Sequence, residues 1–181
     1  IYEEYLSQLK NIEKGHIHST YSTLNLNGFA DDMDYFAKNH PTWSVSFKMV
    51  ESGEYCPHFG PEWYENWILD EWDSKERLPA AQVKIDRAKK ILERNRIVAE
   101  KKEYAWFLFL KKTHLLDTEY YDSKLEDYNP ELVQALNENE IIYKMCNDFG
   151  YEKVDIMMKE NNFDFSLQYL RQSLRPKGDS Q

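Results

Sequence analysis

Apolar residues recur at steps of three and four along most of this chain, a spacing that places them on one face of an α-helix. The longest such stripe begins at Pro79 and runs to about Leu116, through Ala81, Ile85, Ala88, Leu92, Asn95, Ala99, Lys102, Trp106 and Phe109. At 1.5 Å per residue it predicts one helix of roughly 50 Å. The residues 106–110 are apolar all round and should be buried. The first half should pair with another helix or project from the body.

This predicted long helix is basic in an acidic protein. Residues 75–114 hold twelve lysines and arginines against five acidic residues, whereas the whole chain has a net charge of −9. Three interpretations remain open: a solvated face with local ion pairs, docking on acidic groups, including this chain's own helices, or contact with phosphates. The overall acidity and the lack of a nucleic-acid-binding motif disfavour the last.

One stretch alternates instead of following the helical period. Trp43 to Val50 places Trp43, Val45, Phe47 and Met49 on one side, which predicts a strand. Either residues 20–26 or the chain from Tyr55 onward would pair with it, giving at most a small β-hairpin. Further helices are predicted over 2–14, 29–39 and 62–74.

The predicted helix 62–74 carries three tryptophans, Trp63, Trp67 and Trp72. Large aromatic side chains usually pack a core. Tryptophan is also enriched at protein-binding hot spots, so these three residues are secondary candidates for contact with a partner.

The segment from Glu140 to Leu174 predicts three short helices. Gly150 separates the first two, because glycine tolerates the backbone conformations that end helices. Asn161 and Asn162 separate the second from the third. Asp117 to Asn129, which is acidic and rich in tyrosine, is interpreted as the linker that precedes this region.

Two motifs in this segment resemble the ubiquitin-associated (UBA) domain. Residues 149–152 (FGYE) resemble the loop between its first two helices, and residues 162–170 (NFDFSLQYL) resemble the start of its third. Phe149, Ser166 and Arg171 depart from the residues that are usual in the family. The resemblance implies a three-helix fold and an apolar patch that binds ubiquitin or another protein. By this resemblance the binding candidates are Phe149, Gly150, Tyr151, Leu167 and Leu170.

Together these patterns predict a mainly α protein in two parts. Residues 1–128 form a helical body, with at most a small β-hairpin, the Trp-rich helix and one long basic helix. Residues 129–177 form the UBA-like three-helix module. The chain begins at Ile1, which suggests a piece of a longer protein.

Catalytic and metal-binding signals are weak. His16, His18, Cys56 and His58 form two closely spaced pairs that would suit zinc, and Asp31, Asp32 and Asp34 would suit a divalent metal. The spacing matches no common zinc module, and six glycines leave little room for a catalytic loop. Cys146 lies on the predicted core face of its helix, where a thiol is inert. We expect no catalytic residue, no metal and no cofactor.

The most favoured function is therefore a non-enzymatic adaptor or complex subunit that binds another protein, with ubiquitin or a larger assembly as the partner. The alternatives are a metal-dependent enzyme acting on nucleic acid, and an acidic inhibitor or structural subunit that binds a basic partner. Two cysteines are too few for a disulfide framework, and no apolar run approaches the ~20 residues of a membrane span. An intracellular protein, in cytoplasm or nucleus, is expected.

Overall fold

A computed structural model of the chain describes residues 13–51, 53–94, 102–121 and 123–160. These residues form a mainly helical fold with a two-stranded sheet, as the sequence predicts. In chain order the elements are β1 (His16–Tyr21), α2 (Phe29–Asn39), β2 (Ser44–Met49), η1 (Pro57–Phe59), α3 (Glu62–Asp73), α4 (Pro79–Arg94), α5 (Lys102–Leu116), η2 (Asp117–Tyr121), α6 (Leu125–Tyr128), α7 (Pro130–Asn139), α8 (Ile141–Phe149) and α9 (Tyr151–Glu160). Most of the predicted helix 2–14 and all of the third C-terminal helix lie outside the described residues.

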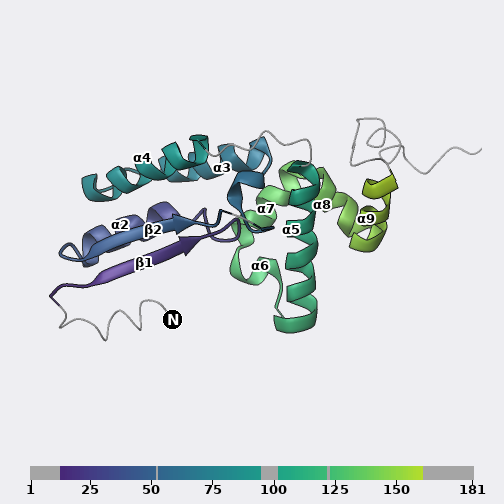
Figure 1. Ribbon diagram of the computed structural model, residues 1–181, viewed down its shortest axis with the longest axis horizontal. Helices are drawn as coiled ribbons and strands as arrows, with labels where there is room; N and C mark the ends of the chain where they lie inside the picture. The colour runs from purple at the N-terminus through teal and green to yellow at the C-terminus, as the bar shows by residue number, and fades with distance from the viewer. Residues whose placement is uncertain (1–12, 52, 95–101, 122, 161–181) are drawn as a thin grey trace, which may run out of the picture.

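The observed sheet is not the predicted β-hairpin. β1 and β2 pair in parallel, with Ile17 opposite Val45 and Tyr21 opposite Met49. The connection between them contains α2, and a crossover of this length returns the chain to the start of the neighbouring strand. The sheet therefore belongs to a β–α–β unit, in which both strands end at the same edge (Figure 1).

Aromatic side chains join this unit to α3. The Phe29 ring lies 4.9 Å from Tyr21, 4.8 Å from Phe47 and 5.0 Å from Trp72, measured between ring centroids. Trp72 is 1% exposed, and its indole N–H donates a hydrogen bond to the Leu26 carbonyl at 3.1 Å. Burying these large rings supplies much of the hydrophobic stabilisation of the N-terminal body.

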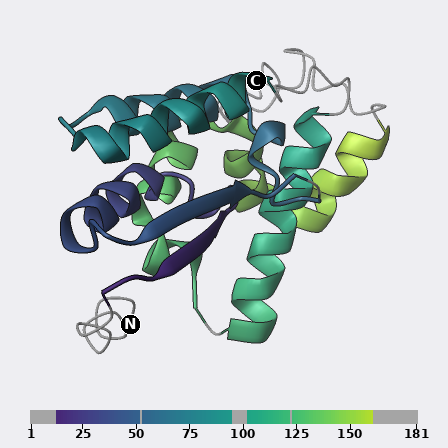
Figure 2. The same cartoon turned by 60° about the vertical axis from the view of Figure 1, so that its left-hand side comes forward.

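The predicted single long helix is wrong. α4 and α5 run in clearly different directions (Figures 1 and 2), and the seven residues 95–101 lie outside the described ranges. α4 packs along α2, and its predicted stripe faces inward: Ala81, Ile85, Ala88 and Leu92 are buried. α4 therefore does not project. The apolar residues of α5 are buried as expected at Trp106, Phe107, Phe109 and Leu110.

Several basic residues of this region pair with acidic groups of the same chain. Arg77 forms an ion pair with Asp31, Lys89 pairs with Asp73, and Lys112 pairs with Glu54 at 3.3 Å. Of the three interpretations of the basic segment, the one that fits these side chains is docking on acidic groups of the same chain.

The segment interpreted as a linker is instead folded. Asp117 opens the π-helical turn η2 and is 9% exposed. Its carboxylate accepts hydrogen bonds from the Leu125 backbone N–H at 2.8 Å and the Tyr128 hydroxyl at 2.9 Å. Groups of the same segment thus fill two acceptor positions of this buried acidic side chain, so the acidic composition of the segment was misleading.

The C-terminal helices pack against the rest of the protein. α8 contacts α5 as well as α7 and α9. Ile142, Met145 and Cys146 of α8 belong to the same buried cluster as the core residues of α5. The boundary between residues 128 and 129 stays a prediction.

Candidate docking site at the α8–α9 corner

The corner between α8 and α9 is built on glycine. α8 ends at Phe149, and the Gly150 backbone N–H donates to the Cys146 carbonyl at 2.8 Å. Gly150 has φ +83° and ψ 148°, a conformation that residues with a Cβ rarely adopt. α9 then begins directly at Tyr151. The predicted helix end at Gly150 is thus confirmed, and the glycine sets the angle between the two helices.

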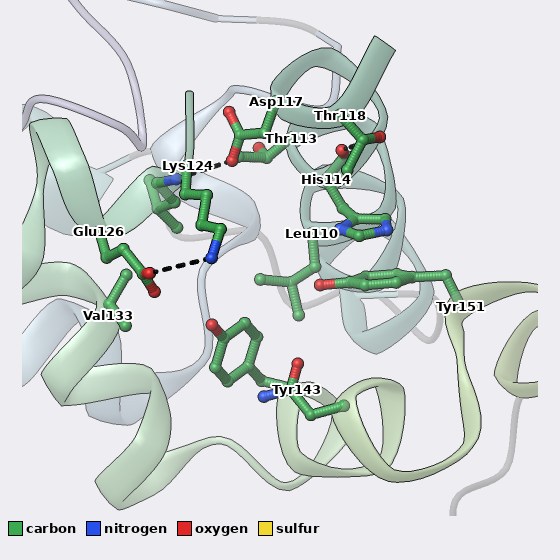
Figure 3. A pocket seen from close by; sticks show the side chains of 12 residues that line it. Leu110, Thr113, His114, Asp117, Thr118, Lys124, Glu126, Val133, Tyr143 and Tyr151 are labelled. Atoms are coloured by element: carbon green, nitrogen blue, oxygen red, sulfur yellow. Dashed lines mark hydrogen bonds and ion pairs between the residues drawn. The ribbon is translucent and has the colours of Figure 1, made fainter. Parts of the chain in front are cut away.

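Tyr151 attaches this corner to α5. Its ring stacks on the His114 imidazole, with ring centroids 4.4 Å apart and planes 12° apart (Figure 3). Burial raises the pKa of the Tyr151 hydroxyl, so the ring stays neutral at physiological pH. The stacked pair divides two hollows, because both His114 and Tyr151 line each of them.

The inner hollow is a small pocket of about 180 Å³ with a lining of mixed polar and apolar side chains. Figure 3 shows side chains from the helices α5 to α9 around it, including His114 of α5, Tyr143 of α8 and Tyr151 of α9. Lys124 and Glu126 form an ion pair of 3.6 Å at one side. Burial raises the pKa of the Tyr143 hydroxyl.

The outer hollow, here called the corner groove, has a volume of about 760 Å³ and lies between α5 and the α8–α9 corner. Two large apolar side chains line it while facing solvent: Leu115 is 44% exposed and Phe149 is 41% exposed. The Lys153 ammonium lies 5.2 Å from the centre of the Phe149 ring. Exposed apolar groups edged by charge are typical of surfaces that bind proteins.

Ion pairs hold α9 against the wall of the groove. Lys111 of α5 reaches Glu152 and Asp155 of α9, at 2.9 Å each, and Lys159 reaches Asp155 at 3.1 Å. Burial acts to raise the pKa of Asp155, but hydrogen bonds from Lys111 and Lys159 outweigh it and lower the pKa. Hydrogen bonds to Glu152 and Asp155 raise the pKa of Lys111.

The predicted binding residues differ in exposure and position. Phe149 and Gly150 are exposed and line the corner groove, and Tyr151 lies half-buried at its floor. Leu167 and Leu170 lie outside the described residues. The contribution of α5 through His114 and Leu115 was not anticipated. The only sequence signal for it was an apolar stretch with no polar face.

The three tryptophans of α3 face inward to different degrees. Trp72 is buried, so its role is core packing and it presents no surface to a partner. Trp63 is half-buried, and its indole N–H donates to the Glu140 carboxylate at 3.0 Å. Trp67 is half-buried and packs beside Tyr64, with ring centroids 5.9 Å apart.

The possible metal ligands are not brought together. His16 and His18 extend from β1 to serine hydroxyls of β2, at 3.1 Å from Ser44 and 2.8 Å from Ser46. Cys56 and His58 are buried at η1. Within the described ranges, no three histidine, cysteine or acidic side chains gather in a way that would hold a metal ion. The three clustered aspartates each contact a different group: Asp31 pairs with Arg77, Asp32 accepts from the Tyr21 hydroxyl, and Asp34 accepts from the Leu78 backbone N–H.

Cys146 is a poor nucleophile. It is 3% exposed, and burial raises the pKa of its thiol to about 12. At neutral pH the thiolate, which is the reactive form, is therefore negligible. The predicted core position of this cysteine is confirmed.

Comparison with known proteins returns no relationship: no family model matches the chain, and no curated protein or solved structure matches it. Among the helices of the described residues, none has the length and apolar character to cross a membrane.

Proposed function

We propose that this protein is a non-enzymatic interaction subunit that binds a partner protein in the corner groove. The observation that carries the proposal is the convergence of two exposed apolar side chains, Phe149 and Leu115, on one groove beside the Gly150 turn. Each of these side chains keeps about two fifths of its surface in water, so covering it would gain roughly 1 kcal/mol of burial energy. A partner that covers them recovers part of that energy.

The resemblance of residues 149–152 and 162–170 to the UBA domain suggests the chemistry of the partner: an apolar patch such as that of ubiquitin. Phe149 and Gly150 supply the loop part of such a site. Lys111, Lys112 and Lys153 stand at the groove together with Glu54, Glu119 and Glu152, so the rim offers charges of both signs. The partner then needs an apolar centre more than a strong charge.

An intracellular location accords with this proposal. Cys56 and Cys146 are both buried and free of disulfides, the state that reducing compartments favour. Either the cytoplasm or the nucleus meets this condition.

The test is an amide NMR titration of the full chain with ubiquitin, comparing Phe149→Ser with Val83→Ser. Val83 is a matched control because it is 67% exposed on α4, away from the groove. We expect shifts clustered on Leu115 and residues 149–153, and at least ~10-fold weaker binding for Phe149→Ser only. Equal binding by both variants, or a spectrum unchanged by ubiquitin, would remove ubiquitin from the proposal.

A second arm tests the groove itself, whatever the partner. Proteins that co-purify with the chain are identified by cross-linking, and each is then titrated in purified form against both variants. If every purified partner binds the Phe149→Ser variant as tightly as the Val83→Ser variant, the corner groove is not the docking site.

A further inference from the structure

A third cavity lies at the edge where the two parallel strands end. Ser22 and Leu24 follow β1, Val50 follows β2, and all three line a cavity of about 590 Å³. Its opposite wall is the end of α5 and the start of η2. Loops that follow parallel strands meet at one edge of a sheet, and crevices at that edge are common ligand sites. The volume lies within the range of roughly 300–1,000 Å³ that is typical of small-molecule sites.

The wall of this cavity combines apolar surfaces with a few polar groups. Leu24, Val50 and Leu116 supply aliphatic surface, and Tyr55 and Tyr128 supply rings. The Thr113 side chain is 3% exposed and lies beside the Tyr55 hydroxyl: burial raises the pKa of Tyr55, and the Thr113 hydroxyl opposes that shift. Neither hydroxyl makes a hydrogen bond of good geometry within the described part of the chain, so both can turn toward a ligand.

The charge in this cavity is negative. Asp117 and Glu54 line it, and its described lining contains no lysine, arginine or histidine. Glu54 is neutralised by Lys112. Asp117 has no cationic partner among the described residues, and its two oxygens accept one neutral donor each. A carboxylate has about four acceptor positions, so two remain for a further donor.

From these observations we propose that the cavity binds a small organic amine, with its ammonium group at Asp117 and its apolar body between Leu24, Val50 and Leu116. A buried carboxylate with no cationic partner gains most from a cation, because opposite charges attract more strongly at a protein wall than in bulk water. Tyrosine ring faces also attract ammonium groups. An anionic ligand such as a phosphate or carboxylate would meet Asp117 without any compensating cation.

The test uses three probes that share one body and differ in charge: tryptamine, tryptophol and indole-3-acetate, titrated into the full chain at pH 7 by calorimetry. We expect tryptamine to bind roughly tenfold or more tightly than tryptophol, and indole-3-acetate not to bind. Equal affinities, a preference for indole-3-acetate, or no binding of tryptamine at millimolar concentration would overturn the proposal.

Two variants locate the site. Asp117→Asn keeps an oxygen for the Leu125 N–H but removes the charge, so tryptamine should weaken to the affinity of tryptophol while tryptophol is unchanged. Val50→Trp fills the cavity and should abolish binding of both, whereas Val83→Trp on the exposed face of α4 should not. If Asp117→Asn does not fold, the Val50→Trp and Val83→Trp pair decides: tryptamine binding that survives Val50→Trp excludes this cavity.

Discussion

Gly150 shows how one residue fixes the position of a whole segment. Its φ of +83° and ψ of 148° place it in a region that is open essentially to glycine alone. A Cβ at this position would meet no atom within 4 Å, so any cost of substitution comes from the backbone and not from a clash. We predict that Gly150→Ala lowers the free energy of unfolding by about 1–3 kcal/mol, measured by urea denaturation.

Gly28 provides the matched control. It precedes α2 with φ −75° and ψ −6°, a helical conformation that every residue adopts, and a Cβ there would lie 3.7 Å from its nearest neighbour. Gly28→Ala should be neutral or slightly stabilising. If both variants lose the same stability, the corner conformation is not what constrains Gly150.

Single residues were predictable where the cause is local. The end of α8 at Gly150 depends on backbone freedom, and the burial of Cys146 depends on helical spacing. The structural role of Asp117 was not predictable. A turn brings its partners, the Leu125 N–H and the Tyr128 hydroxyl, to it, and the amino-acid composition of the segment does not indicate that turn. A polar segment with its hydrogen bonds satisfied internally looks like a linker in the sequence alone.

At the scale of elements, α9 is held to α5 through Asp155, which is 7% exposed and contacts Lys111 and Lys159. We predict that Asp155→Asn lowers the free energy of unfolding by about 1–3 kcal/mol at pH 7, because hydrogen bonds between charged groups are lost. Asp148→Asn, at an exposed position of α8, should change it little. Urea denaturation of both variants measures the difference.

The same carboxylate predicts a pH dependence. The ion pairs hold the pKa of Asp155 below its usual 3.8 in the folded state, so the fold favours the ionised form. This stabilisation is complete above about pH 3.8 and is lost as the pH falls through the lowered pKa. The stability difference between wild type and Asp155→Asn should therefore be constant from about pH 5 to 7 and shrink below about pH 4. A difference that persists unchanged at the lowest pH at which the chain folds would show that the charge is not involved.

Helical periodicity predicted α2, α3, α4 and α8 well, because burial of one face follows directly from spacing. It could not show where a helix changes direction. The stripes of α4 and α5 are both apolar, so the pattern continues across two helices that point differently. β1 was also hard to see, since the sequence HIHSTY carries only two buried residues, Ile17 and Tyr21. Its parallel pairing follows from α2 lying between the strands, which a hairpin prediction did not consider.

On the scale of the whole molecule, the candidate docking site combines a predicted part with an unpredicted one. The α8–α9 corner is local in sequence, so its motif could be found there. His114 and Leu115 come from α5, more than thirty residues earlier, and only tertiary packing brings them to the corner. The cavity at the strand ends was likewise hidden, because Val50, Thr113 and Asp117 share no sequence motif.

Asn129 joins the two predicted parts of the protein. It is 5% exposed, and its side chain accepts from the Leu132 N–H at 3.0 Å as the cap of α7. The same side chain donates to the Leu24 carbonyl and to the Asn27 amide oxygen, both in the loop after β1. We predict that Asn129→Ala lowers the free energy of unfolding by about 2–3 kcal/mol, through a lost cap and the lost hydrogen bond to the half-buried Leu24 carbonyl. Asn137→Ala, on the exposed side of α7, is the control.

This variant also tests the division between residues 128 and 129. All five tryptophans lie at or before residue 106, so their fluorescence reports the first part and, through the hydrogen bond from Trp63 to Glu140, its contact with the second. Amide exchange in α7, α8 and α9 reports the second part. The shared buried cluster and the contacts of α8 with α5 lead us to expect that both probes shift together in urea, as one cooperative unit does. If instead the second part unfolds earlier and the tryptophan transition keeps its midpoint, residues 129–177 behave as a separate module, and Asn129 stabilises only the helix that it caps.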